Sequence, residues 1–451
     1  MDSVIWSRLL TTETLAFHII FATIGVGVPV FISIAEGLGL LKKDPHYLLM
    51  ARRWTRGFVI TVAVGVVTGT CIGVMLSLLW PQFMQLAGNV ISLPLFMETF
   101  AFFFEAIFLG IYLYTWDRFK KPIYHWLTSI PIIIGSTFSA VFITMVNSFM
   151  NTPAGFTIDK PSGKFTSIDP IAAMFNPATP TKVAHVVSSA YLASGFLLAS
   201  IAAYFILRGR NHEYFKKALK LTMIAGFALS LLTILAGDFS GKFLAKYQPA
   251  KLAAMEWHFE TKKEAPLIVG GILDKDTHEV KYSFKIPYGL SILGLGSPEG
   301  KITGLQDIPK DQWPPLFIHY TFDMKVTIGF YLAAIATLFL LLWWWKRGNE
   351  WHPWLMRGIL LAGPLSFVAI ELGWITAEVG RQPWIIQGIM RVQHAATSSN
   401  QVGLIFVLFT ILYCLLAVIC TTVLYRLFKG KGPEKELIER KWESDVEVVN
   451  S

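Results

Sequence analysis

The sequence predicts an all-α integral membrane protein with about nine transmembrane helices. Of its 451 residues, 54% are hydrophobic and only 15% are charged, whereas a soluble chain carries about 25% charged residues. Apolar windows of about 20 residues, the length that a helix needs to cross a bilayer, recur along the chain. Basic residues gather in alternate loops, as they do in multi-pass proteins.

The apolar windows give the helix count. The first window is too long for the core of a signal peptide, and no small-residue cleavage site follows it, so we expect it to be retained. In chain order the windows lie near residues 14–40, 57–79, 91–115, 125–149, 181–207, 219–239, 319–345, 354–378 and 400–428.

The net charge of +9 is distributed in a way that argues against a nucleic-acid partner. The basic clusters occupy alternate loops, where they suit anionic lipid headgroups. The positive-inside rule then places the N-terminus outside and the C-terminus in the cytoplasm. The residues concerned are Lys42, Lys43, Arg52, Arg53, Arg56, Arg118, Lys120, Lys121, Arg208, Arg210, Lys216, Lys217, Lys346, Arg347, Arg426, Lys429, Lys431 and Lys435.

The three cysteines, Cys71, Cys414 and Cys420, all lie in apolar windows. Their spacing matches no zinc or iron–sulfur motif. We therefore expect them to pack as small hydrophobic residues.

Loops divide the chain into four parts. Residues 1–239 hold the first six helices, 240–318 form a long outer loop, 319–428 hold the last three helices, and 429–451 form a charged cytoplasmic tail. No internal repeat is evident. Loops as long as 240–318 are usually functional or disordered.

Two outer segments have a recognisable character. Residues 150–180 are rich in Pro, Gly, Ser and Thr and predict an irregular surface loop. The stretch KLAAMEWHFET, residues 251–261, has helical composition and places Lys251 and Glu256 on a short interfacial helix.

Two histidines in the apolar windows, His18 and His185, are followed by small residues at helical spacing. Ala22, Gly25 and Pro29 share a face with His18 and leave a groove beside it. Such a groove could receive a flat macrocycle edge-on. The alternative is a histidine that hydrogen-bonds to a neighbouring helix. Two such histidines together with intramembrane carboxylates favour ligands.

Glu98 and Glu105 lie seven residues apart, on one face of the third predicted helix. Carboxylates stacked along a membrane helix are typical of proton relays. The alternative is a polar contact between helices.

The stretch GWITAEVGRQPW, residues 373–384, ends the eighth apolar window with closely spaced charges. Glu371 and Glu378 repeat the seven-residue spacing, with Trp374 four residues before Glu378 and Arg381 three residues after it. Intramembrane charges are costly, so they usually have a partner and a function. Arg381 either neutralises Glu378 or binds an anionic propionate of a cofactor.

Four motifs in order resemble subunit I of the cytochrome bd family of quinol oxidases, over nearly the whole chain. They are GWITAEVGRQPW, KLAAMEWHFET, ETFAFFFEAIFLGIYLYTWDRF and GSTFSAVFITMVNSFMNTPAG. The outer loop resembles the short version of the family's quinol loop. The motifs leave open whether the chain carries haem d or, as in the cyanide-insensitive branch, a further haem b.

The resemblance implies that His185 and Met324 are the axial ligands of a low-spin haem b near the outer face. Six-coordinate His/Met ligation favours electron transfer over oxygen binding. Taken alone, Met324 would be a packing residue. The family commonly reads Phe-Arg-x-Met-Val here, whereas Phe322–Val326 of this chain place methionine one residue earlier. A one-residue shift rotates a side chain by about 100°.

The resemblance also implies two high-spin haems, a haem b and either haem d or a further haem b. His18 and Glu378 would each bind one of them, and Trp374 and Arg381 would pack on or pair with these macrocycles. It does not assign the two ligands between the two haems.

The remaining implied roles concern quinol and protons. Lys251 and Glu256 would hold and deprotonate the quinol at the outer loop, and Glu98 and Glu105 would pass protons towards the oxygen-reducing haem. The first six helices would then hold the oxygen-reducing region and the proton path, and the last three would hold haem ligands.

The expected function is that of a terminal respiratory oxidase in a bacterial cell membrane. It would oxidise quinol, either menaquinol or ubiquinol, reduce oxygen to water through three haems, and generate proton motive force by charge separation without a dedicated pump. The expected partners are a second membrane subunit and a small single-helix subunit. The alternatives are a proton-coupled transporter, which predicts broken helices and repeats, and a haem-bearing scaffold without oxidase activity.

Overall fold

The computed structural model describes residues 2–274, 276–346 and 351–442. Within these ranges nine helical spans are long and apolar enough to cross a membrane, which confirms the predicted fold class. Each predicted window falls within one span and overruns it by at most two residues, although the first three spans begin 10 to 12 residues before their windows. The spans are α1 (Ser3–Lys42), α2 (Pro45–Leu79), α3 (Pro81–Tyr114), α4 and α5 together (Pro122–Leu127 and Ser129–Asn151), α7 (Thr179–Leu207), α8 (Glu213–Tyr247), α11 (Ile318–Lys346), α12 (Pro353–Val379) and α13 (Val402–Lys429).

Proline and short polar side chains set several helix starts. Pro45 and Pro81 stand at the first turns of α2 and α3, where a missing backbone N–H removes no hydrogen bond from the helix. Asp44 caps α2, and its carboxylate accepts a bond from the His46 N–H at 3.0 Å. These signals turn the chain sharply, so consecutive helices run antiparallel.

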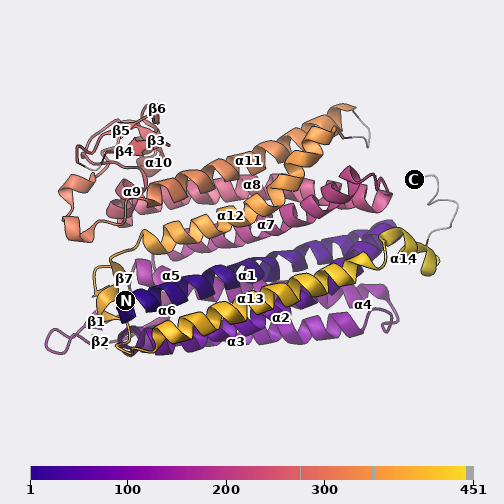
Figure 1. The fold of residues 1–451 in the computed structure, drawn as a ribbon, viewed down its shortest axis with the longest axis horizontal. Coiled ribbons are helices and arrows are strands. Elements are labelled where there is room, and N and C mark those ends of the chain that lie inside the picture. The colour runs from indigo at the N-terminus through magenta and orange to yellow at the C-terminus, as the bar shows by residue number, and fades with distance from the viewer. Residues whose placement is uncertain (1, 275, 347–350, 443–451) are drawn as a thin grey trace.

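The helices form a bundle with connecting segments gathered at two ends (Figure 1). The N-terminus, the strands and α9 lie at one end, whereas α4 and α14 lie at the opposite end. Helix α7 has a central position, since it packs against α8 and α12 and also against α1 and α5. The first end is called the loop end below.

Short hairpins and helices build the loop end. The predicted irregular loop at 150–180 contains a hairpin and α6, and 240–318 contains two hairpins, α9 and α10. The antiparallel pairs are β1 (Thr157–Ile158) with β2 (Phe165–Thr166), β3 (Leu267–Val269) with β6 (Phe284–Ile286), β4 (Ile272–Leu273) with β5 (Val280–Lys281), and β7 (Trp384–Ile386) with β8 (Met390–Arg391). The short helices are α6 (Pro170–Met174), α9 (Pro249–Met255) and α10 (Gly289–Leu295), with 3₁₀ turns at Leu305–Asp307, Lys310–Gln312 and Val392–His394.

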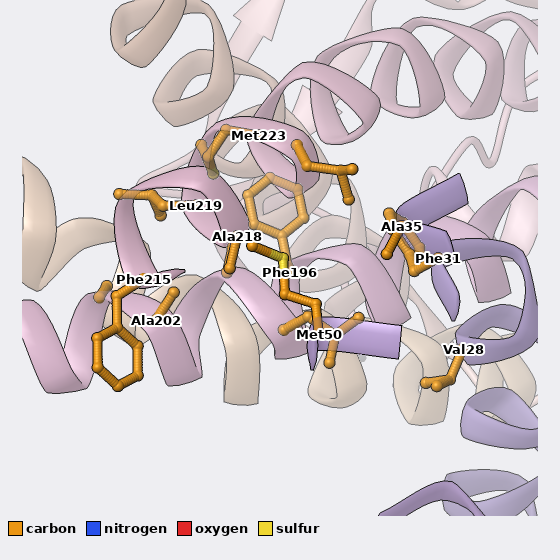
Figure 2. Close-up of a cluster of buried hydrophobic side chains, with 14 of the residues drawn as sticks. Val28, Phe31, Ala35, Met50, Phe196, Ala202, Phe215, Ala218, Leu219 and Met223 are labelled. Atoms are coloured by element: carbon orange, nitrogen blue, oxygen red, sulfur yellow. The ribbon is translucent and has the colours of Figure 1, made fainter. Parts of the chain in front are cut away.

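The largest buried hydrophobic cluster lies where α1, α2, α7 and α8 meet (Figure 2). Phe31, Met50, Phe196 and Met223 are at most 1% exposed there. Small residues allow the helices to approach closely, as is usual in membrane bundles. A Cβ at Gly27 of α1, for example, would lie 2.2 Å from the Ser194 Oγ of α7.

The predicted cytoplasmic tail is folded over part of its length. Helix α14 (Pro433–Glu439) packs on α2, and the Glu436 carboxylate accepts two bonds of 2.7 Å from Arg56 and one of 3.2 Å from Arg53. Two of the basic residues that predicted topology therefore also anchor the tail. Arg347 and residues 443–451 lie outside the described ranges.

The cysteines are unpaired. Cys420 is buried and Cys71 is partly buried, as expected for small hydrophobic residues. Cys414 differs, because it is exposed on the outer surface of α13.

Candidate functional site

Four polar residues from three helices converge where α12 reaches the loop end. The Glu378 carboxylate accepts one bond from the Arg381 guanidinium at 2.6 Å and another from the Asn147 amide of α5 at 2.5 Å. The Asn147 carbonyl oxygen in turn accepts a bond of 2.7 Å from the Lys182 ammonium of α7. Arg381 is only 4% exposed, so this network is internal.

The ion pair between Glu378 and Arg381 fits one of the two interpretations of the sequence. Arg381 does neutralise Glu378, but two of its nitrogens, Nε and Nη1, are buried without a hydrogen-bond partner in the described residues. Unsatisfied buried donors are rare, and they point to an acceptor that binds there. The guanidinium therefore remains able to bind a further anionic group.

The loop helix α9 is docked directly on this helix end. The Lys251 ammonium donates a hydrogen bond of 2.8 Å to the carbonyl of Ala377, the residue before Glu378. Glycine at 380 makes the contact possible, because a Cβ there would lie 2.7 Å from the Lys251 Cε. Burial lowers the pKa of Lys251 to about 7; the Arg381 charge lowers it further and the Glu378 charge opposes the shift.

Glu256 ends α9 and is completely buried. Neither of its carboxyl oxygens has a hydrogen-bond partner in the described part of the chain, and the backbone of Ile268 approaches without reaching hydrogen-bond geometry. Burial raises the pKa of Glu256 to about 8, and the charge of Asp323 adds to the rise. An unpartnered acid of this kind is suited to bind or accept a proton from a polar ligand.

His185 lies on α7 with its ring towards α8. A Cβ at Gly237 of α8 would lie 3.8 Å from the His185 Cε1, and the His185 Nδ1 is buried without a partner among the described residues. Met324, the other predicted ligand of the low-spin haem, is the seventh residue of α11 and has 53% of its surface exposed. Its neighbour Lys325 faces inward, since a Cβ at Gly373 of α12 would lie 3.9 Å from the Lys325 Cδ.

His18 lies on α1 next to α2. Its Nδ1 is hydrogen-bonded to the Thr68 hydroxyl at 2.9 Å, and a Cβ at Gly69 would lie 3.1 Å from its Cε1. The hydrogen bond to a neighbouring helix was one interpretation of this residue, but it uses Nδ1 and leaves Nε2 for another partner. A Cβ at Gly25 would meet no atom within 4 Å, so there is open space along this face.

Glu98 and Glu105 both face α5. The Glu98 carboxylate accepts a bond of 2.8 Å from the Ser139 hydroxyl, and Glu105 is 5% exposed. A Cβ at Gly135 of α5 would lie 2.7 Å from the Glu105 backbone nitrogen, so the two helices are in close contact there. The shared face that the spacing predicts is therefore present.

Glu371 and Trp374 lie on α12 between the bundle core and the loop end, and both are partly buried. The Glu371 Oε1 is buried without a hydrogen-bond partner in the described ranges. Seven residues make about two helical turns, so Glu371 and Glu378 lie on one side of α12, about 10 Å apart along its axis.

Sequence reasoning missed Asn147, Lys182 and Lys325. All three are polar residues inside apolar windows, and that signal alone could have identified them. It also missed a buried cluster near the opposite end of the bundle. There the Glu36 carboxylate bonds to the Tyr112 hydroxyl and to the His125 Nδ1, each at 2.6 Å.

Comparisons with known proteins cover nearly the whole chain. The family model described as cytochrome bd terminal oxidase subunit I matches residues 6–432. A bd oxidase structure from Geobacillus thermodenitrificans is similar with a TM-score of 0.90 and 58% identity, covering 96% of this chain and 99% of that chain.

Two curated relatives come from Bacillus subtilis strain 168. A putative cytochrome bd menaquinol oxidase subunit I is 40% identical over 443 residues, which cover 97% of this chain and 99% of the relative. A cytochrome bd ubiquinol oxidase subunit 1 is 30% identical over 454 residues, with coverage of 97% and 95%.

Proposed function

We propose, since this chain belongs to the cytochrome bd terminal oxidase subunit I family, that it oxidises membrane quinol at the loop end and reduces oxygen to water with three haems as cofactors. Membership of the family establishes three properties of the chain. The chain is a multi-pass membrane protein and a subunit of a haem-containing quinol oxidase, and it works with a partner subunit. We propose the roles of individual residues in addition.

The contact between Lys251 and Ala377 carries the proposal. It joins the loop helix that would bind quinol to the helix end that bears Glu378. An electron donor bound beside Lys251 would therefore lie next to the cofactor region of the bundle. A lysine has three N–H donors, so the bond to Ala377 leaves two for a quinol oxygen.

Glu256 would accept the quinol proton. Its raised pKa makes the ionised form a better base than an exposed carboxylate, and general bases work best when their pKa lies near the operating pH. Because Glu256 and Lys251 lie at the loop end, the protons would leave on that side.

The residues present fit the haems that the family implies. Among the described residues, His185 and His18 each have a ring nitrogen without a hydrogen-bond partner, and Arg381 has two buried unsatisfied donors suited to a propionate. Haem supplies the electron transfer and oxygen chemistry when bound. His18 and Glu378 would hold the two high-spin haems, with Trp374 and Arg381 beside them. One of these is a haem b, and the other is haem d or a further haem b.

Protons for water would come from the opposite side. Helix α3 starts at the loop end, so Glu105 lies farther towards the other end than Glu98 (Figure 1). A proton would reach Glu105 first and Glu98 next. Release of quinol protons outside and uptake of protons from the cytoplasm would separate charge without a pump. In this topology the N-terminus lies outside and the C-terminus lies in the cytoplasm. The membrane would be the bacterial cell membrane.

The division of the chain follows from these roles. Residues 1–239 would serve oxygen reduction and proton uptake, 240–318 quinol binding, and 319–428 haem ligation, with 429–451 in the cytoplasm. A second membrane subunit and a small single-helix subunit would complete the oxidase. The transporter alternative has no support in the family to which the chain belongs.

The test uses the purified complex with its partner subunit. Menaquinol and ubiquinol analogues are supplied separately, and oxygen uptake is measured alongside a reduced-minus-oxidised spectrum and pyridine-haemochrome analysis. We expect quinol-dependent oxygen uptake and three haems per complex. A haem-loaded complex that consumes no oxygen with either quinol would contradict the proposal.

A further inference from the structure

We infer that Lys325, rather than Met324, supplies the second axial ligand of the low-spin haem that His185 binds. The inference rests on the proposed function, because it assumes a low-spin haem beside His185. The Lys325 amine nitrogen would take the position that the family resemblance implied for a methionine sulfur. The chemical class of the ligand changes from a thioether to a primary amine.

The direction of the two side chains on α11 is the first argument. Successive residues of an α-helix point about 100° apart, so Met324 and Lys325 cannot both face the same neighbour. Met324 is 53% exposed at the surface of the bundle. Lys325 faces α12, where a Cβ at Gly373 would lie 3.9 Å from its Cδ.

The position of Lys325 relative to His185 is the second argument. Lys325 lies within electrostatic range of His185 on α7 and of Lys251 on α9. Its side chain therefore reaches the interior between these helices.

The state of the two nitrogens is the third argument. Within the described ranges, the His185 Nδ1 is buried without a partner and the Lys325 Nζ has no ion pair or hydrogen bond. The Lys325 Nζ lies over the Phe322 ring, 5.1 Å from the centroid. A cationic amine inside a membrane bundle normally has a carboxylate or a functional partner. His185 and Lys325 therefore offer two nitrogen donors without hydrogen-bond partners in the described residues, and a six-coordinate haem iron takes two ligands from the protein.

Small residues leave room for a macrocycle between them. Gly329 lies one turn beyond Lys325 on the same face of α11, and a Cβ there would meet no atom within 4 Å. Gly237 of α8 borders the His185 ring. A flat group can therefore approach the helices closely on both sides of the site.

Ligation by lysine requires that the ammonium release its proton to solvent at the loop end, so that the nitrogen lone pair can form the bond to iron. No electron is transferred in this step. An amine is a harder donor than a thioether and stabilises the ferric state. Met/His ligation raises the reduction potential of a haem. A low-spin centre with Lys325 should therefore have a lower midpoint potential than the same centre with methionine.

The experiment compares the ferric low-spin signals of the purified, haem-loaded complex by electron paramagnetic resonance and near-infrared magnetic circular dichroism. Wild-type protein should lack the charge-transfer band of thioether ligation. Lys325→Met should gain that band, remain low-spin and show a raised midpoint potential. Lys325→Ala should lose the low-spin signal while the other haems are retained. Met324→Leu is the matched control and should be unchanged.

Either of two results would overturn the inference: a thioether band in wild-type protein, or loss of the low-spin signal in Met324→Leu. If Lys325→Ala fails to assemble, the wild-type band and Met324→Leu still decide between the ligands. His185→Ala separates this inference from the proposed function. If the low-spin signal survives in His185→Ala, the proposed haem site is wrong as a whole. If the low-spin signal is lost both in His185→Ala and in Met324→Leu, only the role of Lys325 is wrong.

Discussion

The substitution Glu256→Gln tests the proposed proton acceptor while it preserves the shape and burial of the side chain. Glu256 is completely buried, and its pKa of about 8 means that about a tenth of the protein carries the ionised form at pH 7. The ionised form is the one that accepts a proton. Its fraction rises to about nine tenths at pH 9, so the rate of quinol oxidation should rise about ninefold between these pH values.

Glutamine cannot accept the proton, so the variant should lose this pH dependence. General-base catalysis contributes about 10²–10⁴-fold to a rate, and the quinol-dependent kcat should fall within that range. The assay is steady-state oxygen uptake at saturating quinol from pH 6 to about 9, limited to the range in which the haem spectrum is stable. Haem content should not change, because Glu256 lies in the loop outside the bundle.

Glu260→Gln is the matched control, since Glu260 is an exposed acid four residues farther along the same loop. It should keep the wild-type rate and pH profile. Oxygen uptake driven by a small reductant that reduces the haems directly should be equal in both variants. If Glu256→Gln keeps the wild-type kcat and its rise with pH, then Glu256 does not accept the quinol proton.

Three further predictions concern the other groups of the site. Lys251→Ala should impair turnover with quinol at least tenfold, because it removes about 1.4 kcal/mol or more of binding free energy, and all haem signals should remain intact. Unchanged steady-state kinetics would mean that the quinol site lies elsewhere. His185→Ala should abolish the low-spin haem b signal and quinol oxidation, because it removes a buried ring nitrogen that has no partner in the described residues. An unchanged low-spin spectrum would refute the assignment. Glu378→Gln should deplete one high-spin haem more strongly than Arg381→Gln does. Glu378→Gln removes the ligand charge itself, whereas Arg381→Gln leaves a ligand whose charge is poorly compensated in a low-dielectric site. Full haem content and activity in Glu378→Gln would mean that the two residues form only a structural ion pair.

The sequence predicted the helix count and the apolar part of each helix because the bilayer requires long apolar segments, whereas the helix ends beyond those segments were not predicted. The stretch GWITAEVGRQPW likewise indicated charges inside the membrane before any neighbour was known. The seven-residue spacing of Glu371 and Glu378 also indicated that both lie on one side of the helix. Spacing along one helix specifies a shared face, but partners come from other helices: Glu378 bonds to Asn147 of α5.

The contact between Lys251 and Ala377 could not be predicted from sequence, since 126 residues separate them. It depends on how α9 folds back onto the end of α12 and on the missing side chain at Gly380. The same holds for the buried, unpartnered state of Glu256, which arises from the packing of the loop over α9.

The sequence by itself determined the class of protein, the order of its helices and the residues that can carry charge or bind a cofactor, because these depend on composition and on local spacing. Only the tertiary structure decided which of two adjacent residues, Met324 or Lys325, faces the interior. That choice depends on the rotation of α11 about its own axis, which is set by packing against α8 and α12. A turn of about 100° exchanges the two side chains without any change in the helical pattern, so hydrophobic periodicity cannot distinguish them.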